Sequence, residues 1–134
     1  MCKLLQQYGP VLGRILLSVI FIIAGARKMS GFTGTAAYMA SKGLPMSEVL
    51  LVFTIIIELG GGLMILLGWQ ARGAATAIFL FLIPVTVVFH PVWADAAEFN
   101  SFFKNLAIMG GMIYIMVYGS GPLSLGRDHC PGNK

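Results

Sequence analysis

The chain is 134 residues long, 57% of them hydrophobic and only 10% charged, with a mean hydropathy of +0.86 and a formal net charge of +4. Soluble domains carry about 25% charged residues, and so small a domain has too much surface for its volume to bury this much apolar side chain. These values exclude an ordinary soluble protein and favour one that faces lipid. The few basic residues are scattered, which excludes a nucleic-acid-binding patch and suits the flanks of membrane helices.

Four apolar stretches approach the length of about 20 residues that a transmembrane helix needs. We expect spans at about 8–28, 48–69, 71–90 and 102–118, followed by a polar tail at 119–134. Strands of a membrane barrel would be about 10 residues long and would alternate in polarity, whereas these stretches are apolar on every face. The sequence therefore predicts an all-α membrane protein, a four-transmembrane-helix antiparallel bundle that forms a single domain.

The first apolar stretch also fits another interpretation. Lys3, the apolar run and the small residues Ala24 and Ala26 resemble a secretory signal peptide with its cleavage site. Arg14 lies just before the most apolar part, as a charge in the leading region of a signal peptide would. We favour a retained first helix, because three more apolar stretches follow it.

A short interfacial helix is expected between spans one and two. It is predicted over about 35–42, with Thr33 or Thr35 as its N-terminal cap and Gly43 as its C-terminal stop. The mixture of aromatic, apolar and basic side chains in this segment suits the surface of a membrane.

Glu58 lies near the middle of the second span. A lone charge at that depth costs several kcal/mol, so Glu58 should be protonated, paired or in contact with water. Arg14 is the expected partner, because antiparallel helices would place it about five residues, or roughly 7 Å, from the same depth. Arg72 is the second candidate. Two interpretations stay open, a core polar pair that fixes helix packing and a proton, ion or ligand site at Glu58.

A second group of polar residues is expected at one face of the membrane, where antiparallel helices bring the ends of spans one and three to the start of span four. This candidate pocket consists of Lys28, His90, Lys104 and Asn105, with Tyr38 and Trp93 as secondary members. Such a pocket could hold a quinone carbonyl or an anionic head group, and a histidine can exchange a proton near neutral pH. The alternative is ordinary anchoring of helices at the interface by basic and aromatic side chains.

Two cysteines lie near opposite ends of the chain, Cys2 and Cys130. An even number of spans places both on one side, which leaves a disulfide or redox chemistry at His129 and Cys130 open. Free thiols are favoured, and no metal site is predicted, because no paired or zinc-binding spacing occurs. Basic residues are slightly more frequent on the side of the termini, which favours both termini in the cytoplasm.

Short motifs accompany these polar residues along the chain. In order they are Arg14, Gly25 with Lys28, Gly31-Phe32, Gly34-Thr35, Tyr38, Gly43-Leu44-Pro45, Glu58-Leu59-Gly60-Gly61-Gly62, Gly68, Arg72, Phe89-His90 and Lys104-Asn105-Leu106. In this combination, over about residues 10–125, the sequence resembles the DoxX family of small bacterial membrane proteins.

The resemblance implies a four-helix bundle in the bacterial inner membrane. It also implies a link to redox systems, since related DoxD-type proteins are subunits of a thiosulfate:quinone oxidoreductase and others are linked to oxidative-stress complexes. We therefore expect an accessory or quinone-facing subunit of a membrane redox or sulfur-linked system, rather than a self-sufficient enzyme. Its expected ligands are quinone or lipid, and its expected partners are membrane or peripheral redox proteins, or further copies of itself.

Two alternatives come from other functional classes. One is a small-molecule or proton carrier in which Glu58 is the titrating group. The other is a non-catalytic membrane partner protein, whose glycine-rich helix faces bind other helices. The resemblance assigns no catalytic residue.

Overall fold

The computed structural model describes residues 1–126, and within this range it contains helices and no strand. The elements are α1 (Cys2–Ser30), α2 (Phe32–Ser41), α3 (Ser47–Ile55), the π-helical turn η1 (Ile56–Gly60), α4 (Gly61–Leu67), α5 (Ala71–Phe89), the short 3-10 turn η2 (Ala96–Glu98) and α6 (Phe99–Tyr118). Four helical segments are long and apolar enough to cross a membrane: Cys2–Ser30, Ser47–Leu67, Ala71–Phe89 and Ala96–Tyr118. The predicted fold, four apolar helices with a short helix after the first, is confirmed.

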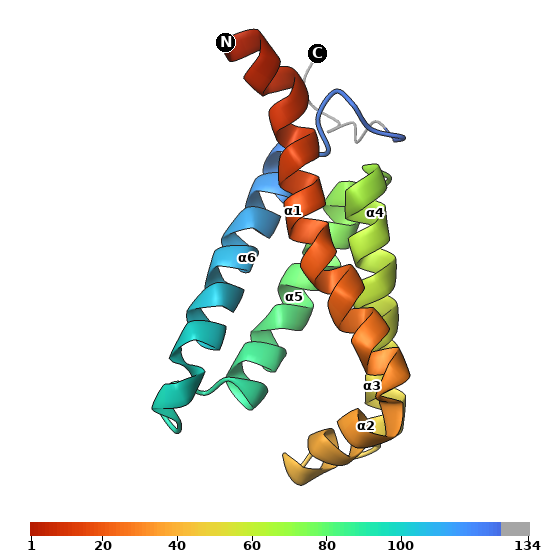
Figure 1. Ribbon diagram of the computed structural model, residues 1–134, viewed down its shortest axis with the longest axis vertical. Helices are drawn as coiled ribbons and strands as arrows, with labels where there is room; N and C mark the ends of the chain where they lie inside the picture. The colour runs from red at the N-terminus through yellow and green to blue at the C-terminus, as the bar shows by residue number, and fades with distance from the viewer. Residues whose placement is uncertain (127–134) are drawn as a thin grey trace.

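The long helices pair along their lengths (Figure 1). α1 lies against the helix formed by α3, η1 and α4, while α5 lies against α6. Toward one end of the molecule α5 and α6 diverge from α1, and α2 lies across the α1 side of that end. We call this the α2 end. The opposite end, which holds the N-terminus, the α4–α5 turn and the segment 119–126, is called the tail end.

Close packing of α1 on η1 and α4 depends on two glycines. A Cβ atom on Gly25 would lie 2.6 Å from Cγ of Leu59, and one on Gly62 would lie 3.3 Å from Cβ of Phe21. Small residues at such positions let two helix backbones approach closely, which is a main source of helix association in lipid. These contacts set the register of the two antiparallel helices, with Gly25 level with Leu59.

The middle of the bundle is apolar. Ile65, Ile78 and Met112 are completely buried there, and Phe21 is nearly so. Many large apolar side chains point outward instead, among them Leu16, Phe53, Leu80 and Val117. Lipid tails accept such an exterior, which explains how a chain of this size can be so apolar.

The second span is not a regular α-helix. Its five central residues, Ile56–Gly60, form the π-helical turn η1, and Glu58 lies in it. A π-turn inserts an additional residue and changes the direction of the side chains around it, and such turns are frequent at functional sites. Nothing in the sequence indicates this turn.

The short helix α2 differs in detail from its prediction. It covers Phe32–Ser41, and its N-cap is Gly31. Thr35 is therefore inside the helix, and its hydroxyl donates to the carbonyl of Gly31 at 2.9 Å instead of capping the first turn. Gly43 lies just beyond the helix with a φ of +81°, a left-handed conformation that favours glycine and stops a helix.

The irregular segment 119–126 folds back over the tail end of the bundle. The backbone N–H of Leu125 donates to the carbonyl of Leu67 at 3.0 Å, and that of Gly126 donates to Gly68 at 3.2 Å. Cys2 is exposed, whereas Cys130 lies outside the described residues, so the expectations about the two thiols stay predictions.

Candidate functional site

The most buried carboxylate of the described residues is that of Glu58, a residue that is only 6% exposed. The ammonium of Lys28 donates to both of its oxygens, at 2.9 and 3.0 Å. Lys28 comes from the last turn of α1 and Glu58 from η1, so the pair joins the first two spans near the α2 end. A directly bonded cation offsets much of the cost of holding a carboxylate in the membrane.

The sequence predicts Arg14 as the partner of Glu58, but the structure pairs Glu58 with Lys28 instead. The reason is the register of the helices. Gly25 lies against Leu59, so Glu58 faces the last turn of α1, while Arg14 lies several turns away at the tail end. The prediction centred the first span near the middle of 8–28, whereas α1 begins at residue 2 and its first turns extend past the other helices (Figure 1).

The two arginines bind backbone at the tail end. Arg14 is 4% exposed, its Nη2 donates to the carbonyl of Leu123, and its guanidinium lies against Gly68. Its Nε and Nη1 have no hydrogen-bond partner among the described residues, and it borders a cavity of about 340 Å³ between α1 and α6. Nη1 of Arg72 donates to the carbonyl of Met116 at 3.3 Å. Neither arginine reaches Glu58, so the second candidate partner is replaced as well.

Two further hydrogen-bonded pairs lie at the α2 end. His90 directly follows α5, and its Nδ1 lies 2.6 Å from Oε2 of Glu98 in η2. Asn105 is 5% exposed, and its side-chain amide donates to Oγ1 of Thr86 at 3.1 Å. The hydroxyl of Thr86 in turn donates to the carbonyl of Leu82 at 2.6 Å.

We call these side chains together the polar cluster; it consists of Lys28, Glu58, Thr86, His90, Glu98 and Asn105. It draws residues from α1, η1, α5, η2 and α6, and from the position after α5. Over residues 1–126, no group of three or more His, Cys, Asp or Glu side chains could hold a metal ion.

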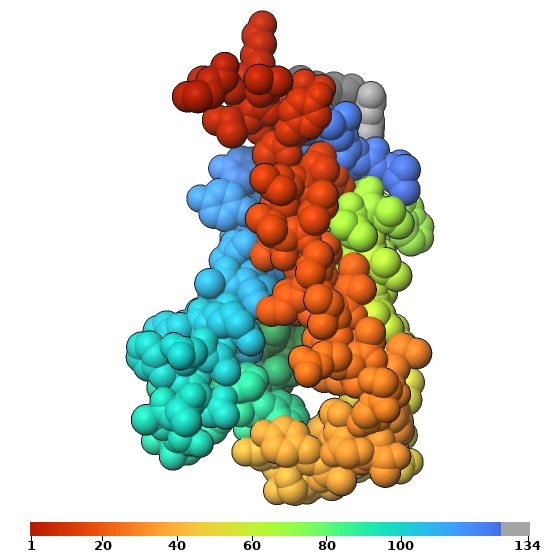
Figure 2. All heavy atoms as spheres, in the orientation of Figure 1, coloured from red at the N-terminus to blue at the C-terminus, as the bar shows by residue number. Residues whose placement is uncertain are grey.

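Two cavities meet at the polar cluster. The α2-side cavity, of about 190 Å³, is bordered by α1, α2, α3, η1 and α5, and the α6-side cavity, of about 150 Å³, is bordered by α1, η1, α5 and α6. Lys28, Glu58, Val85 and His90 border both cavities. Figure 2 shows the molecule hollowed between the start of α6 and the end of α1 with α2, with α5 at the back of the recess. The ion pair thus lies between two small spaces at the α2 end.

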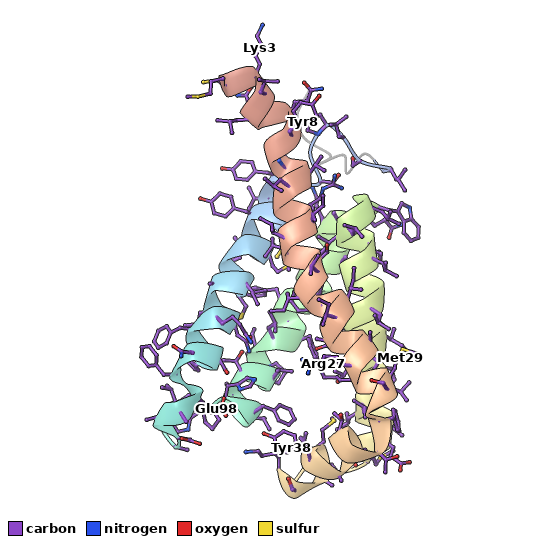
Figure 3. All side chains as sticks on the ribbon, in the orientation of Figure 1. Lys3, Tyr8, Arg27, Met29, Tyr38 and Glu98 are labelled. Carbon is purple, nitrogen blue, oxygen red and sulfur yellow. The ribbon has the colours of Figure 1, made fainter. Side chains whose placement is uncertain are left out.

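The structure brings the predicted pocket residues together. All four of them border the α6-side cavity: Lys28, His90, Lys104 and Asn105. Of the secondary members, Tyr38 borders the α2-side cavity, with its ring centroid 5.7 Å from that of Phe89. Trp93 borders neither cavity; it is 65% exposed and packs edge-to-face on Phe102. Tyr38 and Glu98 lie on opposite sides of the opening at the α2 end (Figure 3). The functional role of these residues stays a prediction.

Two members of the polar cluster are absent from the predicted site. Glu98 follows His90 by eight residues in a short loop, and this proximity is a signal that could have found it. Thr86 is different, because a threonine inside an apolar helix commonly bonds its own backbone. Only the packing of α5 on α6 shows that its hydroxyl also accepts from Asn105.

Comparisons with known proteins agree with this architecture. The family model described as DoxX matches residues 9–91, more than half of the chain. The chain belongs to the DoxX family. It is 36% identical over 125 residues to Inner membrane protein YqjF of Escherichia coli (strain K12), covering 93% of this chain and 95% of that relative. It is 34% identical over 122 residues to Inner membrane protein YphA of the same strain, with 87% of each chain covered. No solved structure gives a significant match.

This DoxX protein is therefore an inner membrane protein with several membrane-spanning helices. The segment matched by the family model contains Lys28, Glu58 and His90, while the α6 side of the site lies outside it. The ion pair and the histidine thus belong to the part of the chain that defines the family match.

Proposed function

We propose that this DoxX protein is an accessory, quinone-facing subunit of a membrane redox system, including sulfur-linked systems. The observation that carries the proposal is the Lys28–Glu58 ion pair, whose carboxylate is buried between two small cavities at one end of the bundle. Ionisable groups within a membrane are expensive, and they mark ligand sites or proton pathways more often than they serve packing alone.

The walls of the α2-side cavity suit a flat apolar ring. Phe81, Phe89 and Tyr38 contribute aromatic surface, and Val85 contributes aliphatic surface. Small-molecule sites are typically lined by such side chains, with a few polar groups that fix orientation. The ammonium of Lys28 supplies such a group, because two of its three hydrogens serve Glu58 and the third is left for a carbonyl oxygen.

The cavity volume also limits the ligand. Pockets for drug-sized molecules measure about 300–1,000 Å³, whereas the two cavities here have about 190 and 150 Å³. A single-ring head group matches this size, and a long apolar tail would extend from the opening into lipid. This supports a one-ring quinone rather than an extended cofactor.

Filling the cavities tests the proposal without altering any charge. Val85 borders both cavities, while Val87 of the same helix is 51% exposed on the outside. Val85→Phe should reduce binding of tetramethylbenzoquinone to the protein in lipid nanodiscs by about tenfold or more, which corresponds to about 1.4 kcal/mol. Val87→Phe is the matched control and should bind as the wild type does. Absence of binding by the wild type would reject the quinone site and favour the non-catalytic membrane partner.

The proposed accessory role also concerns the orientation of the protein in the membrane and the protein that it binds. The slight excess of basic residues near the termini supports both termini in the cytoplasm, which would place the α2 end and both cavities on the periplasmic side. A membrane or peripheral redox protein, or a second copy of the chain, would then meet the bundle at or beside that end. Purification from native membranes under mild conditions should recover such a partner together with bound quinone.

A carrier that uses Glu58 is the second candidate. The observation in its favour is that Glu58 lies on a π-turn between two cavities. Against it, the apolar layer of Ile65, Ile78 and Met112 separates the polar cluster from the tail end. Proton flux into liposomes that is lost in Glu58→Gln would support the carrier, and flux equal to that of empty liposomes would exclude it.

A further inference from the structure

The pair formed by His90 and Glu98 determines which nitrogen of the imidazole can accept a hydrogen bond from a ligand. Nδ1 of His90 lies 2.6 Å from Oε2 of Glu98. A carboxylate can only accept a hydrogen bond, so Nδ1 of a neutral imidazole must carry the hydrogen. Nε2 is then left with a lone pair, and His90 borders both cavities. A ligand in either cavity that reaches Nε2 therefore meets a hydrogen-bond acceptor.

Asn105 provides a second acceptor by a similar argument. The hydroxyl of Thr86 donates its only hydrogen to the carbonyl of Leu82, at 2.6 Å. The amide of Asn105 must therefore donate to Thr86, which fixes its orientation and leaves its carbonyl oxygen as an acceptor and its second N–H as a donor. This oxygen accepts no hydrogen bond from the described residues, and Asn105 is 95% buried at the wall of the α6-side cavity.

The charged donors of the site are the lysines, beside the second amide hydrogen of Asn105 and the hydroxyl of Tyr38. Lys28 has one hydrogen left after Glu58, and Lys104 borders the α6-side cavity. The site therefore combines two acceptors with a nearby ammonium. A hydroxyl group, which donates and accepts at once, matches this arrangement, whereas a carbonyl oxygen can only accept and leaves both acceptors unpaired.

We propose that the site binds the reduced, hydroxyl form of its ligand, a quinol, more tightly than the quinone, and that Glu98 is the positioning residue that sets this preference by holding His90 as an acceptor. The inference rests on the proposed quinone site and deepens it. The preference belongs to the neutral imidazole, because an imidazolium would donate from both nitrogens. The other ionisable groups around His90 are Lys28 of α1, Tyr38 of α2, Glu58 of η1, Asp95 and Glu98 of the loop, and Lys104 of α6.

The test compares tetramethylhydroquinone with tetramethylbenzoquinone, whose fully substituted rings do not alkylate thiols. Binding to the protein in nanodiscs is measured at mildly alkaline pH, where histidine side chains are ordinarily neutral. The wild type should bind the quinol about two- to tenfold more tightly than the quinone, the range expected for one hydrogen bond. Glu98→Ala should lose most of this preference.

Asp95→Ala is the matched control. It removes an equal charge from the same loop and breaks only the bond from the N–H of Ala97, so the preference should survive. Equal binding of the two ligands by the wild type, or a preference that Glu98→Ala leaves intact, would overturn the inference.

A second measurement separates this inference from the proposed function. In a His129→Gln background, nitrogen NMR of the His90 ring should show the hydrogen on Nδ1, and Glu98→Ala should move it to Nε2. A hydrogen already on Nε2 in the wild type overturns the inference, whether or not any ligand binds. If the hydrogen is on Nδ1 but neither ring compound binds, the failure belongs to the quinone site and not to the role of Glu98.

Discussion

The two ends of the bundle each hold a cation, and they use it differently. At the tail end, Arg14 donates to the backbone of Leu123, and the segment 119–126 is joined to the end of α4. At the α2 end, Lys28 bonds a carboxylate, and neighbouring side chains bond one another beside two cavities. Arg14 also keeps donors at a cavity of about 340 Å³, but its described hydrogen bond is to backbone, whereas the polar cluster joins side-chain donors and acceptors from several helices beside two cavities. This difference is the basis for proposing a ligand site at the α2 end.

The largest effect is expected from breaking the ion pair at the α2 end. Lys28→Met leaves Glu58 buried without its cation, which should lower the free energy of unfolding by about 3–5 kcal/mol. The double variant Lys28→Met/Glu58→Gln removes both charges and should recover part of that loss. Reversible unfolding in mixed micelles measures both. A double variant no more stable than the worse single variant would show that the two residues are not coupled.

A smaller loss is expected where α1 touches the second span. Gly25→Ala places a Cβ 2.6 Å from Cγ of Leu59, and such overpacking typically costs about 1–3 kcal/mol. Gly110→Ala is the matched control, because nothing lies within 4 Å of its Cβ position. That control should leave stability unchanged or raise it by up to about 1 kcal/mol through helix propensity. Equal losses in both variants would contradict the register described here.

If the two ends are independent, substitutions at them should have additive effects on the free energy of unfolding. Arg14 and Glu58 share no contact among the described residues. The effects of Arg14→Gln and Glu58→Gln on the free energy of unfolding should therefore add to within about 0.5 kcal/mol in the double variant. A coupling energy well above this would restore the pairing that the sequence suggests and remove the distinction between the ends.

Cysteine labelling tests the positions of the two ends most directly, and its single-cysteine variants should have the smallest effect on stability. In a chain with Cys2→Ser and Cys130→Ser, single cysteines at His90 and Lys104 should react from the same face of the membrane. A cysteine at Gln70, in the turn at the tail end, should react from the opposite face. Labelling of positions 90 and 104 from different faces would refute the four-span topology. The face at which position 70 reacts also tests the proposed cytoplasmic location of the termini.

Much of the candidate site could be predicted from the sequence. Helices that span a bilayer must begin and end at its two faces, so polar residues at successive span ends are forced to one of two depths. Lys28, His90, Lys104 and Asn105 were grouped in this way, and all border one cavity. The partner of Glu58 could not be predicted from the sequence, because the pairing depends on the register of two packed helices.

The sequence by itself determined that the chain spans a membrane with four helices and that Lys28, His90, Lys104 and Asn105 gather at one face of it. Hydropathy and segment length decide these features, since each segment must satisfy its own backbone in lipid. The tertiary structure alone decided that Glu58 lies on a π-turn facing Lys28 and that Arg14 binds the backbone at the tail end. The first depends on the register of α1 against the second span, which Gly25 and Gly62 allow through close approach of two backbones. The second depends on how the segment 119–126 folds back over the bundle.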